Sequence, residues 1–427
     1  MAHAFPPIQK SAEAFHKLYG GKKILVKAGG AELAPHLLPL LAEQIRGLTR
    51  NDIHVTLVFG GGPQISAQWN AKHQEKRPMK NGVGITTTDV LRDGVQPAYE
   101  EVRGRLLAVL PEMRVLEPHQ VHAEQDPDPA LGFVGNVRDI PALESSHALT
   151  GIGFLGKDRN QFLNINADSI VSAVVRQMGE KINEVILLTE SGGVNDKEQR
   201  RVPLIMSDDF PAILEGTHPT INVDGGMMKK MEEVYRMLGQ VGKVAMTRGS
   251  ELLQEIEQWR GSGTLSVASD QLTMGPLLRI EDDIFDAVLA EYVAQKTFRP
   301  PRSETELMEL KDCHQLLRIK NSPLGGFSLL PHGRWMELSK LWSGYIGNGI
   351  GKRLVRSARE QTHAKGHDLY ALTMAEEVKE LFLKNGFSSE GSVSDVRSRN
   401  GDLSGILKDY DATERNPEVF TARHGTS

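Results

Sequence analysis

Short apolar runs alternate with amphipathic helical stretches along the first part of the chain. The run KILVK at Lys23–Lys27 ends in glycines, and leucine and isoleucine then recur at helical spacing over residues 31–50. The pattern repeats where HVTLVF runs into three glycines, and later where EVILLT precedes SGG and TINV precedes DGG. Strands that end in glycine-rich turns and lead into helices are typical of βαβ units on a parallel sheet. Such a sheet binds ligands beyond the carboxyl ends of its strands.

The pattern changes near residue 265. The stretch LSVASDQLTMGP mixes small residues with a Gly-Pro pair and has no helical periodicity. We therefore predict an α/β domain with a parallel sheet at residues 1–265, a linker at 266–275 and a second domain at 276–427.

The second domain has a different order of elements. Helices are expected near residues 281–297 and 303–312, followed by the strand-like runs HQLLRIK, GGFSLL and MELSKLW. A further helix, the strand-like run DLYALTM and a short helix ending in KNGF come next. This order predicts an α+β domain with a mixed sheet. Residues 412–427 are expected to form a mobile tail.

Composition narrows the class of protein. With 39% hydrophobic and 25% charged residues, the 427-residue chain has the composition of a soluble globular protein. A formal net charge of -5 argues against a dedicated nucleic-acid binder, and no apolar run approaches the ~18–20 residues of a membrane span. The N-terminus lacks the apolar core of a signal peptide. Cys313 is the single cysteine, which excludes intrachain disulfides and multi-cysteine metal sites. We expect a cytoplasmic protein with no metal centre.

Candidate phosphate chemistry follows the strand ends of the first domain. Lys27 ends the first strand, Gly60–Gly62 end the second, and Lys230 follows the TINVD strand. Glycine turns let backbone N–H groups approach an anion at a helix start, and lysines neutralise a transferring phosphoryl group. Asn164 and Asp168 stand four residues apart at a predicted helix start. Plain tight turns and solvated lysines are the alternative interpretation of each signal alone.

Together and in this order, these segments resemble the amino-acid kinase family, in particular acetylglutamate kinases, over residues 20–265. GFVGNV at 132–137 and LLTESGGVND at 187–196 belong to the resemblance. The resemblance implies ATP-Mg as a cosubstrate if this site is active. It also implies that Lys27 and Lys230 stabilise the transferring phosphoryl group and that Asp168 positions these lysines. By the same resemblance, Asn164 binds the amino-acid substrate, and Gly61 and Gly62 contact phosphate oxygens.

One position departs from that family. Its G-L-R-V-T-D segment carries an arginine that grips a substrate carboxylate, whereas this chain reads GVGITT and has Gly84 there. Loss of a charge-assisted pair costs on the order of 1.5–3 kcal/mol. The departure predicts that phosphorylation of N-acetylglutamate is absent or very weak.

Residues 249–264, GSELLQEIEQWRGSGT, resemble the segment that lines the inhibitor site of arginine-sensitive acetylglutamate kinases and synthases. The resemblance implies that Glu255 pairs with an arginine effector and that Gly261 lies on the loop around it. It also implies a homo-oligomer, because SAEAFHKLYGG resembles the N-terminal helix that mediates assembly in those proteins. The alternative is an amphipathic helix with a glycine C-cap before the linker.

The sharpest motif is the string YIGNGIGK at Tyr345–Lys352, which follows a predicted strand and opens a predicted helix. Consecutive amide N–H groups at such a turn suit a pyrophosphate. A dinucleotide fingerprint would need a βαβ unit and an acidic residue about 20 positions further on. The order of elements instead resembles the GNAT acetyltransferases across about residues 276–410. The resemblance implies acetyl-CoA binding by Ile346, Gly347, Asn348, Gly349, Ile350, Gly351 and Lys352.

In GNAT enzymes the strand before this loop splays from its neighbour. The resemblance implies that backbone N–H groups near Leu341 and Trp342 polarise the thioester carbonyl. Phe382 stands where many members have a tyrosine acid. The segment RPPRSETEL resembles one in acetylglutamate synthases and makes Arg302 the expected carboxylate ligand, with Ser404 as a further substrate contact. A solvated helix-flanking arginine is the alternative for Arg302.

Glu337, on the same predicted strand, is a candidate acceptor for the ammonium proton through water. The alternative for this glutamate is a solvent-facing side chain on the strand.

The pairing of the two domains resembles the N-acetylglutamate synthase family. It implies transfer of acetyl from acetyl-CoA to L-glutamate, the entry to arginine biosynthesis, with arginine as effector. A bifunctional synthase and kinase, or an acetylglutamate kinase, is a second hypothesis. A non-catalytic arginine sensor is the third, and the GNGIG loop argues against it because a sensor needs no pyrophosphate cradle.

Overall fold

The computed structural model describes residues 8–80, 83–144, 147–345, 347–399, 401–408, 410 and 416–424. Two compact units divide the chain between Asp270 and Gln271. We call the unit at residues 15–270 the N-terminal unit, and the unit formed by residues 8–14 and 271–424 the C-terminal unit.

Two features of this division differ from the predicted domain limits. Residues 8–14 belong with the C-terminal unit, where the backbone N–H of Ser11 donates to Asp283 at 2.7 Å. Residues 266–275 include the end of strand β14 (Thr264–Val267) and the start of strand β15 (Thr273–Pro276). The segment predicted as a linker is thus built into both sheets.

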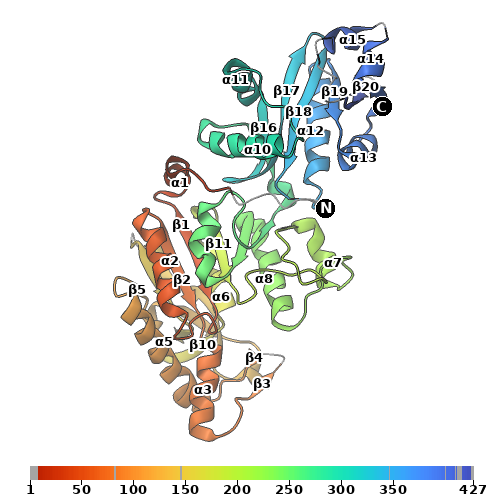
Figure 1. The fold of residues 1–427 in the computed structure, drawn as a ribbon. Helices are drawn as coiled ribbons and strands as arrows, with labels where there is room; N and C mark the ends of the chain where they lie inside the picture. The colour runs from red at the N-terminus through yellow and green to blue at the C-terminus, as the bar shows by residue number, and fades with distance from the viewer. Residues whose placement is uncertain are drawn as a thin grey trace. The chain divides into compact units, whose positions relative to one another are not determined.

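The N-terminal unit is built on an eight-stranded sheet (Figure 1). Its strands, in spatial order, are β12 (Leu204–Met206), β14, β13 (Lys243–Thr247), β11 (Ile182–Leu188), β1 (Lys23–Ala28), β2 (His54–Phe59), β8 (Leu149–Ile152) and β5 (Arg114–Val115). Neighbouring strands run parallel except at the β13–β14 pair, which is antiparallel. The α/β class with a parallel sheet is confirmed.

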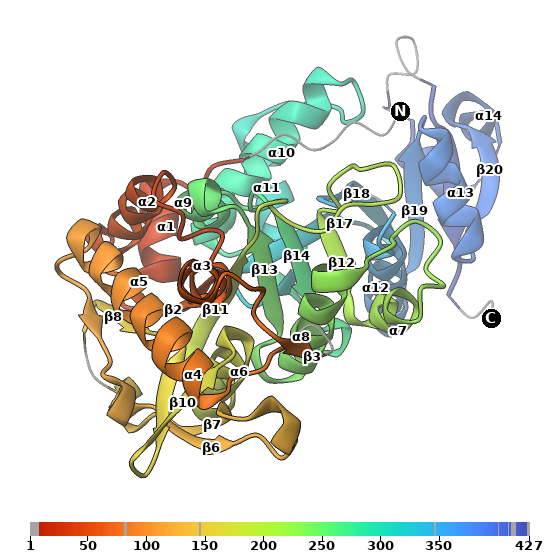
Figure 2. The same cartoon turned by 90° about the horizontal axis from the view of Figure 1, so that it is seen from below.

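Helices cover both faces of this sheet (Figures 1 and 2). The core on one face joins alternate residues of the central strands to α6 (Ala167–Met178) and α8 (Gly225–Val241). Alternation is expected because successive side chains on a strand point to opposite faces. On the other face, α2 (Leu38–Arg50) packs against β2. The same helix also contacts α5 (Gln96–Val109) and α9 (Leu252–Glu257). Helix α1 (Ala12–Tyr19) begins in the C-terminal unit and ends in the N-terminal unit. The other α-helices among the described residues of the N-terminal unit are α3 (Gly62–His73), α4 (Thr88–Val90) and α7 (Phe210–Leu214).

Two smaller sheets complete the N-terminal unit. One is a closed four-stranded barrel formed by β6 (His122–Gln125), β7 (Val134–Asp139), β9 (Leu155–Asp158) and β10 (Gln161–Ile165). The other is the short antiparallel pair of β3 (Met79–Lys80) and β4 (Val83–Gly84). Strand β10 ends directly before α6, so it delivers its last residues to the helix N-terminus.

The C-terminal unit has a seven-stranded mixed sheet. In spatial order it contains β15, β16 (His314–Ile319), β17 (Ser322–His332), β18 (Trp335–Ser343), β19 (Asp368–Thr373), β21 (Glu418–Ala422) and β20 (Ser388–Ser392). Among the described residues of this sheet, only β18 and β19 pair in parallel, and α12 (Ile350–Ala364) connects them. The other helices are α10 (Asp282–Ala294), α11 (Glu304–Asp312), α13 (Glu376–Lys384), α14 (Val393–Arg397) and α15 (Asp402–Ile406).

The predicted mobile tail is wrong for its central part. Strand β21 lies between β19 and β20, and its Val419 and Phe420 are fully buried. The segment VFTA has the alternation and β-branched residues of a strand, but the turn residues before it hide this signal.

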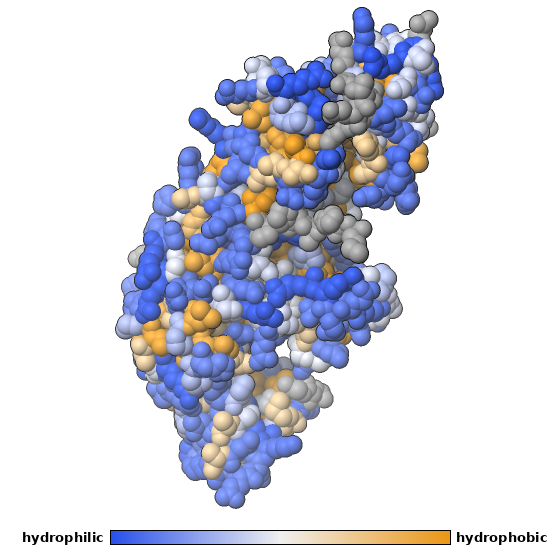
Figure 3. Space-filling model, in the orientation of Figure 1, coloured by the Kyte–Doolittle hydropathy of each residue, from blue (hydrophilic) through white to orange (hydrophobic). Residues whose placement is uncertain are grey.

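The face drawn in Figure 3 is mostly hydrophilic, and its apolar side chains form small separate groups. Within the described residues, no helix has the length and apolar character needed to cross a membrane.

Candidate functional site

A cavity of about 670 Å³ opens in the C-terminal unit. Leu330, Glu337 and Tyr370 form part of its wall and lie side by side in the register of β17, β18 and β19. Directly paired residues on neighbouring strands project to the same face of a sheet. The floor of the cavity is therefore a row of side chains, one from each of three neighbouring strands.

Glu337 is the acidic group on that floor. The hydroxyl of Tyr370 donates to Glu337 Oε2 at 3.2 Å, and Nε2 of His332 lies 3.4 Å from the same oxygen. Burial raises the pKa of Glu337, but the contact with His332 and the hydrogen bond from Tyr370 outweigh this effect and leave the pKa below its ordinary value. Its side chain is 23% exposed, so the alternative of a solvent-facing strand glutamate is wrong.

Two arginines stand in another wall of the cavity. Arg299 is paired with Glu306 of α11, which also accepts from the backbone N–H of Arg302. The exposed guanidinium of Arg302 forms no ion pair with the side chains that the structure describes. Arg302 is therefore the arginine of this cavity that can bind a carboxylate. Ser404 is not part of the cavity wall, because its hydroxyl donates to the carbonyl of Gly401 at 2.6 Å on α15.

Strand β18 leaves β19 partway along its length. Their pairing covers Trp335 to Leu338 of β18 and stops there, although β18 continues beside β17 to Ser343. A register shift against β17 leaves Lys340 and Leu341 outside the ladder, and Lys340 has a φ of +51°. A bulge of this kind turns backbone groups out of a ladder.

Beyond the bulge, the indole N–H of Trp342 donates to His314 Nε2 at 3.1 Å. This contact anchors the end of β18. The splay that the GNAT resemblance implied is present beside Leu341 and Trp342.

The glycine-rich loop leads into α12. Gly347 and Gly349 have φ values of +85° and +74°, a region that residues with a Cβ rarely adopt, and Gly349 is the N-cap. A Cβ on either glycine would meet no atom within 4 Å, so the space beside the loop is open. Helix α12 begins at Ile350 and includes Gly351 and the exposed Lys352. Asn348 lies between the two glycines, and Ile346 lies outside the described residues.

In the N-terminal unit, three charged side chains of the kinase-like motif meet. Lys27 Nζ lies 2.8 Å from Asp168 Oδ1, and Lys27 is buried. Burial lowers the pKa of Lys230, and the neighbouring charge of Lys27 lowers it further. Gly61 caps α3, and a Cβ there would lie 2.3 Å from the ring of Phe154, so the close approach requires glycine. Gly62, the next residue, faces open space.

Asn164 lies in a second group of side chains. Its Nδ2 donates to Thr86 Oγ1 at 3.0 Å, and the same oxygen lies 3.4 Å from Nη2 of Arg77. A Cβ on Gly84 would lie 2.2 Å from Cζ of Arg77. The guanidinium of Arg77 thus occupies the space beside Gly84. The prediction of weak kinase activity rested on the lack of an arginine at residue 84, and the chain brings another arginine to the same place.

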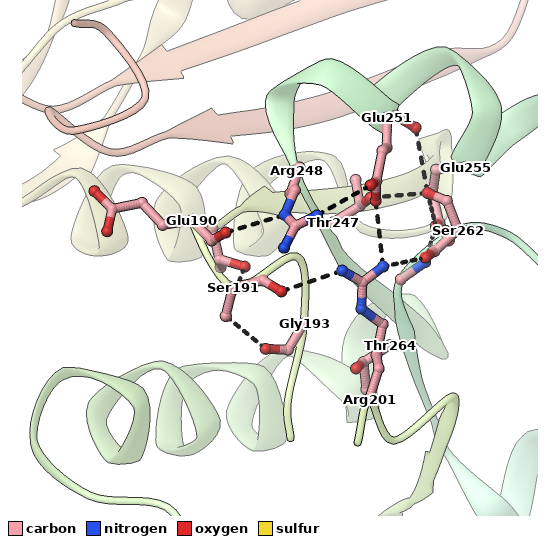
Figure 4. Close-up of polar contacts among 12 residues, drawn as sticks. Glu190, Ser191, Gly193, Arg201, Thr247, Arg248, Glu251, Glu255, Ser262 and Thr264 are labelled. Carbon is pink, nitrogen blue, oxygen red and sulfur yellow. Dashed lines mark hydrogen bonds and ion pairs between the residues drawn. The ribbon is translucent and has the colours of Figure 1, made fainter. Parts of the chain in front are cut away.

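The carboxylate of Glu255 is bound by its own loop (Figure 4). Its Oε2 accepts from the backbone N–H of Ser262 at 2.6 Å and of Gly263 at 2.8 Å, and from the Ser262 hydroxyl at 3.0 Å. Gly261 has a φ of +72°, and a Cβ there would lie 2.3 Å from Glu255 Oε1. Helix α9 is capped by Gln258, so the alternative of a glycine C-cap at residue 261 is wrong.

Around Glu255, further side chains extend the network. Arg201 Nη1 lies 3.2 Å from Glu251 and donates to the Ser262 carbonyl at 2.6 Å (Figure 4). Arg248 donates to the Glu190 carbonyl at 3.1 Å. Glu255 itself is 6% exposed, and donors of the 261–263 loop bind its carboxylate.

The Amino acid kinase family matches residues 22–245, which are more than half of the chain. The chain belongs to the amino acid kinase family. Its match covers Lys27, Asn164, Asp168 and Lys230, the side chains on which the resemblance rested.

Acetylglutamate kinases are among the relatives of this family member. The protein from Granulibacter bethesdensis is 30% identical over 266 residues, which cover 54% of this chain and 82% of that protein. The protein from Xanthomonas campestris pv. campestris is 28% identical over 272 residues, which cover 60% of this chain. That match spans 62% of the Xanthomonas protein's own length.

The fold of the whole chain is similar to that of N-acetylglutamate synthase from Neisseria gonorrhoeae. The structure of that enzyme with coenzyme A and L-arginine has a TM-score of 0.68 at 17% identity and covers 97% of this chain and 98% of its own. The structure with coenzyme A and N-acetyl-glutamate has a TM-score of 0.57 with the same coverage. This family member therefore has an amino-acid-kinase-like fold joined to an acetyltransferase-like fold.

Sequence reasoning missed His332, Tyr370 and Lys340 in the C-terminal unit and Arg77 in the N-terminal unit. His332 and Tyr370 are residues of ordinary strands, and no local motif links them to Glu337. Lys340 lies in a strand-like run whose bulge depends on the partner strand. Arg77 stands in the polar stretch KHQEKRP, where its charge gives no signal of burial.

Proposed function

We propose that this protein is an amino-acid N-acetyltransferase that makes N-acetyl-L-glutamate from L-glutamate and acetyl-CoA, the first step of arginine biosynthesis. The observation that carries the proposal is the separation of β18 from β19 after Leu338, beside a glycine loop that starts a helix. A thioester placed in this opening meets the backbone N–H groups of a bulged strand. Such fixed dipoles stabilise the negative charge that develops on the carbonyl oxygen.

Acetyl-CoA would be held by its pyrophosphate. The loop at Gly347 to Gly351 and the first turn of α12 present backbone N–H groups and the positive end of the helix dipole to an anion. Lys352 in the first turn adds a side-chain charge. The loop is open to solvent on this side, as a large ligand requires.

The acceptor amino acid would lie in the cavity above Glu337. Arg302 supplies a cation for a carboxylate, and Glu337, directly or through water, accepts the proton that the ammonium group must lose before it attacks the thioester. His332 and Tyr370 keep Glu337 ionised, because both favour the carboxylate over the acid. Phe382 packs against Phe387 and Phe420 in the core, so it takes no part in protonation of the thiolate.

Purified protein with L-glutamate and acetyl-CoA tests the proposal. We expect free coenzyme A to appear in a one-to-one ratio with N-acetyl-L-glutamate. Arg302→Ala should raise the KM for glutamate by about 10–100-fold, since it removes a charge-assisted pair. The matched control is Arg279→Ala, which changes an exposed arginine outside the cavity and should leave this KM unchanged. Release of coenzyme A without acetylglutamate would contradict the proposal.

We also propose that L-arginine regulates this activity through the loop that binds Glu255, and that the protein acts as a homo-oligomer. The Neisseria enzyme has been solved with L-arginine bound. In this chain, Glu251 and Glu255 lie in one network and can bind a guanidinium after the loop at 261–263 moves.

Bifunctional synthase and kinase activity is the second candidate. The grouping of Lys27, Asp168 and Lys230 favours it. Acetylglutamate with ATP-Mg, followed by detection of ADP, tests this candidate separately from acetyl transfer.

A further inference from the structure

Four buried residues of the C-terminal unit form one chain of hydrogen bonds. The indole N–H of Trp342 donates to His314 Nε2 at 3.1 Å, and His314 Nδ1 lies 2.9 Å from the hydroxyl oxygen of Ser328. The Ser328 hydroxyl donates to the carbonyl of Leu310 at 3.1 Å. The chain therefore runs from β18 through β16 and β17 to α11.

The order of donors and acceptors fixes the protonation of His314. An indole N–H can only donate, so Nε2 carries no proton. Because the Ser328 hydroxyl gives its hydrogen to Leu310, it accepts from Nδ1–H of the histidine. Burial agrees with a neutral ring, since it lowers the pKa of His314 to about 3. His314 is therefore a fixed acceptor for Trp342 and not a proton carrier.

Close packing holds the imidazole in place. The ring of Phe285 packs against it at an interplanar angle of 71°, with the ring centroids 4.7 Å apart. A Cβ on Gly326 would lie 2.5 Å from His314 Nε2, so the strand beside the imidazole requires glycine there. Gly326 is also the ladder partner of Trp342. The same small residue thus makes room for the histidine and pairs with the tryptophan that the histidine binds.

The two ends of the chain lie beside the two substrates of the proposed reaction. Trp342 pairs with β17 again directly after the bulge at Lys340 and Leu341, where the proposed function places the thioester. Leu310 belongs to α11, a helix that contributes to the wall of the acceptor cavity. The hydrogen bonds thus connect the strand beside the thioester to the helix beside the acceptor amine.

We propose that His314 is a positioning residue for acetyl transfer. It holds Trp342, and through it the bulge of β18, in a fixed place relative to α11, so that the thioester and the amine meet in the reactive geometry. This inference rests on the proposed function and adds to it a buried residue that lies outside the cavity wall. A displacement of about 1 Å caused far from the reacting atoms can lower a rate on the order of 100-fold.

Two substitutions break the central bond, one from each side. Trp342→Phe removes the indole donor, and His314→Leu removes the acceptor. Each should lower kcat by about 10–100-fold and leave the KM values for acetyl-CoA and glutamate within about two-fold, because the binding groups stay and only their mutual orientation changes. The double variant should be no slower than either single variant, since both remove the same bond. We express kcat per bound coenzyme A, so that loss of folded protein does not count as loss of rate.

A rescue and a matched control separate positioning from stability. His314→Gln brings an amide oxygen near the position of Nε2 and should recover most of the lost rate. Trp335→Phe makes the same substitution at the other end of β18, where the buried indole N–H has no hydrogen-bond partner among the described residues. This control should keep the wild-type kcat. If His314→Leu does not fold, Trp342→Phe and His314→Gln carry the same test.

The indole N–H signals of the four tryptophans give a readout that does not depend on activity. In a ¹H–¹⁵N spectrum, the signal that is lost in Trp342→Phe identifies Trp342. This signal should shift in His314→Leu and stay in place in Trp335→Phe, because only the first change removes its acceptor.

Three outcomes would overturn the proposal. They are an unchanged kcat in both His314→Leu and Trp342→Phe, an equal loss of kcat in Trp335→Phe and Trp342→Phe, and a Trp342 indole signal that does not respond to His314→Leu. A wild type that makes no N-acetyl-L-glutamate would instead remove the proposed function, and this inference with it.

Discussion

Glu337 and Glu255 are both largely buried, but the pKa values of their carboxyl groups are shifted in opposite directions. Burial raises the pKa of each. For Glu337, His332 and Tyr370 outweigh burial, so the carboxylate stays ionised. For Glu255, the nearby charge of Glu184 adds to burial, and the donors of the 261–263 loop offset only part of it, which leaves the pKa at about 7.

Glu337→Gln should lower kcat by about 10²–10⁴-fold, the range for a lost general base, with little effect on the KM for acetyl-CoA. Because the pKa of Glu337 is lowered, the acidic limb of the wild-type rate profile should lie below the ordinary value of 4.5. Tyr370→Phe removes one stabilising donor and should move that limb to higher pH while keeping most of the rate. Steady-state kinetics between pH 4 and 9 measures both effects. If the Glu337→Gln variant has the same rate profile as the wild type, flat down to pH 4, Glu337 is excluded as the base.

The raised pKa of Glu255 makes a prediction about stability. Between pH 4.5 and about 7 the folded protein binds a proton that the unfolded chain releases, so the free energy of unfolding should fall as the pH rises. The full effect is at most about 3 kcal/mol. Glu255→Gln keeps the hydrogen-bond acceptor and should remove this slope. Urea unfolding at pH 5 and pH 7.5 measures it, and equal slopes for both proteins would contradict the assignment.

At the scale of elements, helix α12 connects the parallel strands β18 and β19 and presents its N-terminus to the open loop. Its two ends both carry glycines with positive φ, Gly349 at +74° and Gly366 at +75°. The ends therefore have the same backbone requirement, and only the first belongs to the proposed acetyl-CoA site.

Gly349→Val should raise the KM for acetyl-CoA by ten-fold or more. A β-branched residue disfavours positive φ by roughly 1–2 kcal/mol, so the loop would leave the shape that directs its N–H groups to the pyrophosphate. Gly366→Val carries the same backbone cost at the other end of α12 and should lower the thermal midpoint without raising this KM. Equal acetyl-CoA kinetics in the two variants would show that the loop does not bind the cofactor.

For the whole molecule, the proposed arginine control has to couple a site in the N-terminal unit with acetyl transfer in the C-terminal unit. A ligand changes such an equilibrium only if it binds two arrangements unequally. Coupling of about 1–3 kcal/mol corresponds to a roughly 5–150-fold change.

Arginine should therefore change the acetyl transfer activity of the wild type within that range, and Glu255→Gln should require more arginine for the same change. Glu257→Gln, at the end of the same helix α9, is the matched control and should behave as the wild type. The measurement is a titration of activity against arginine for all three proteins. A wild type that does not respond would remove the regulatory proposal, and superimposable curves would remove Glu255 from it.

The sequence by itself predicted the main strand-to-helix steps of both units, because apolar periodicity and glycine turns are local properties. KILVK and HVTLVF form β1 and β2, and the YIGNGIGK string leads into α12. Strand β21 was not predicted, because a strand of five residues is stabilised by its two neighbouring strands more than by its own composition.

Only the tertiary structure decided which distant side chains meet. The register of three strands places Leu330, Glu337 and Tyr370 in one row, and a one-residue slip would turn each to the other face. Arg77 lies beside Gly84 because β3, which follows Arg77 in the chain, pairs with β4, which contains Gly84. Such contacts depend on pairing between segments, which no local pattern encodes.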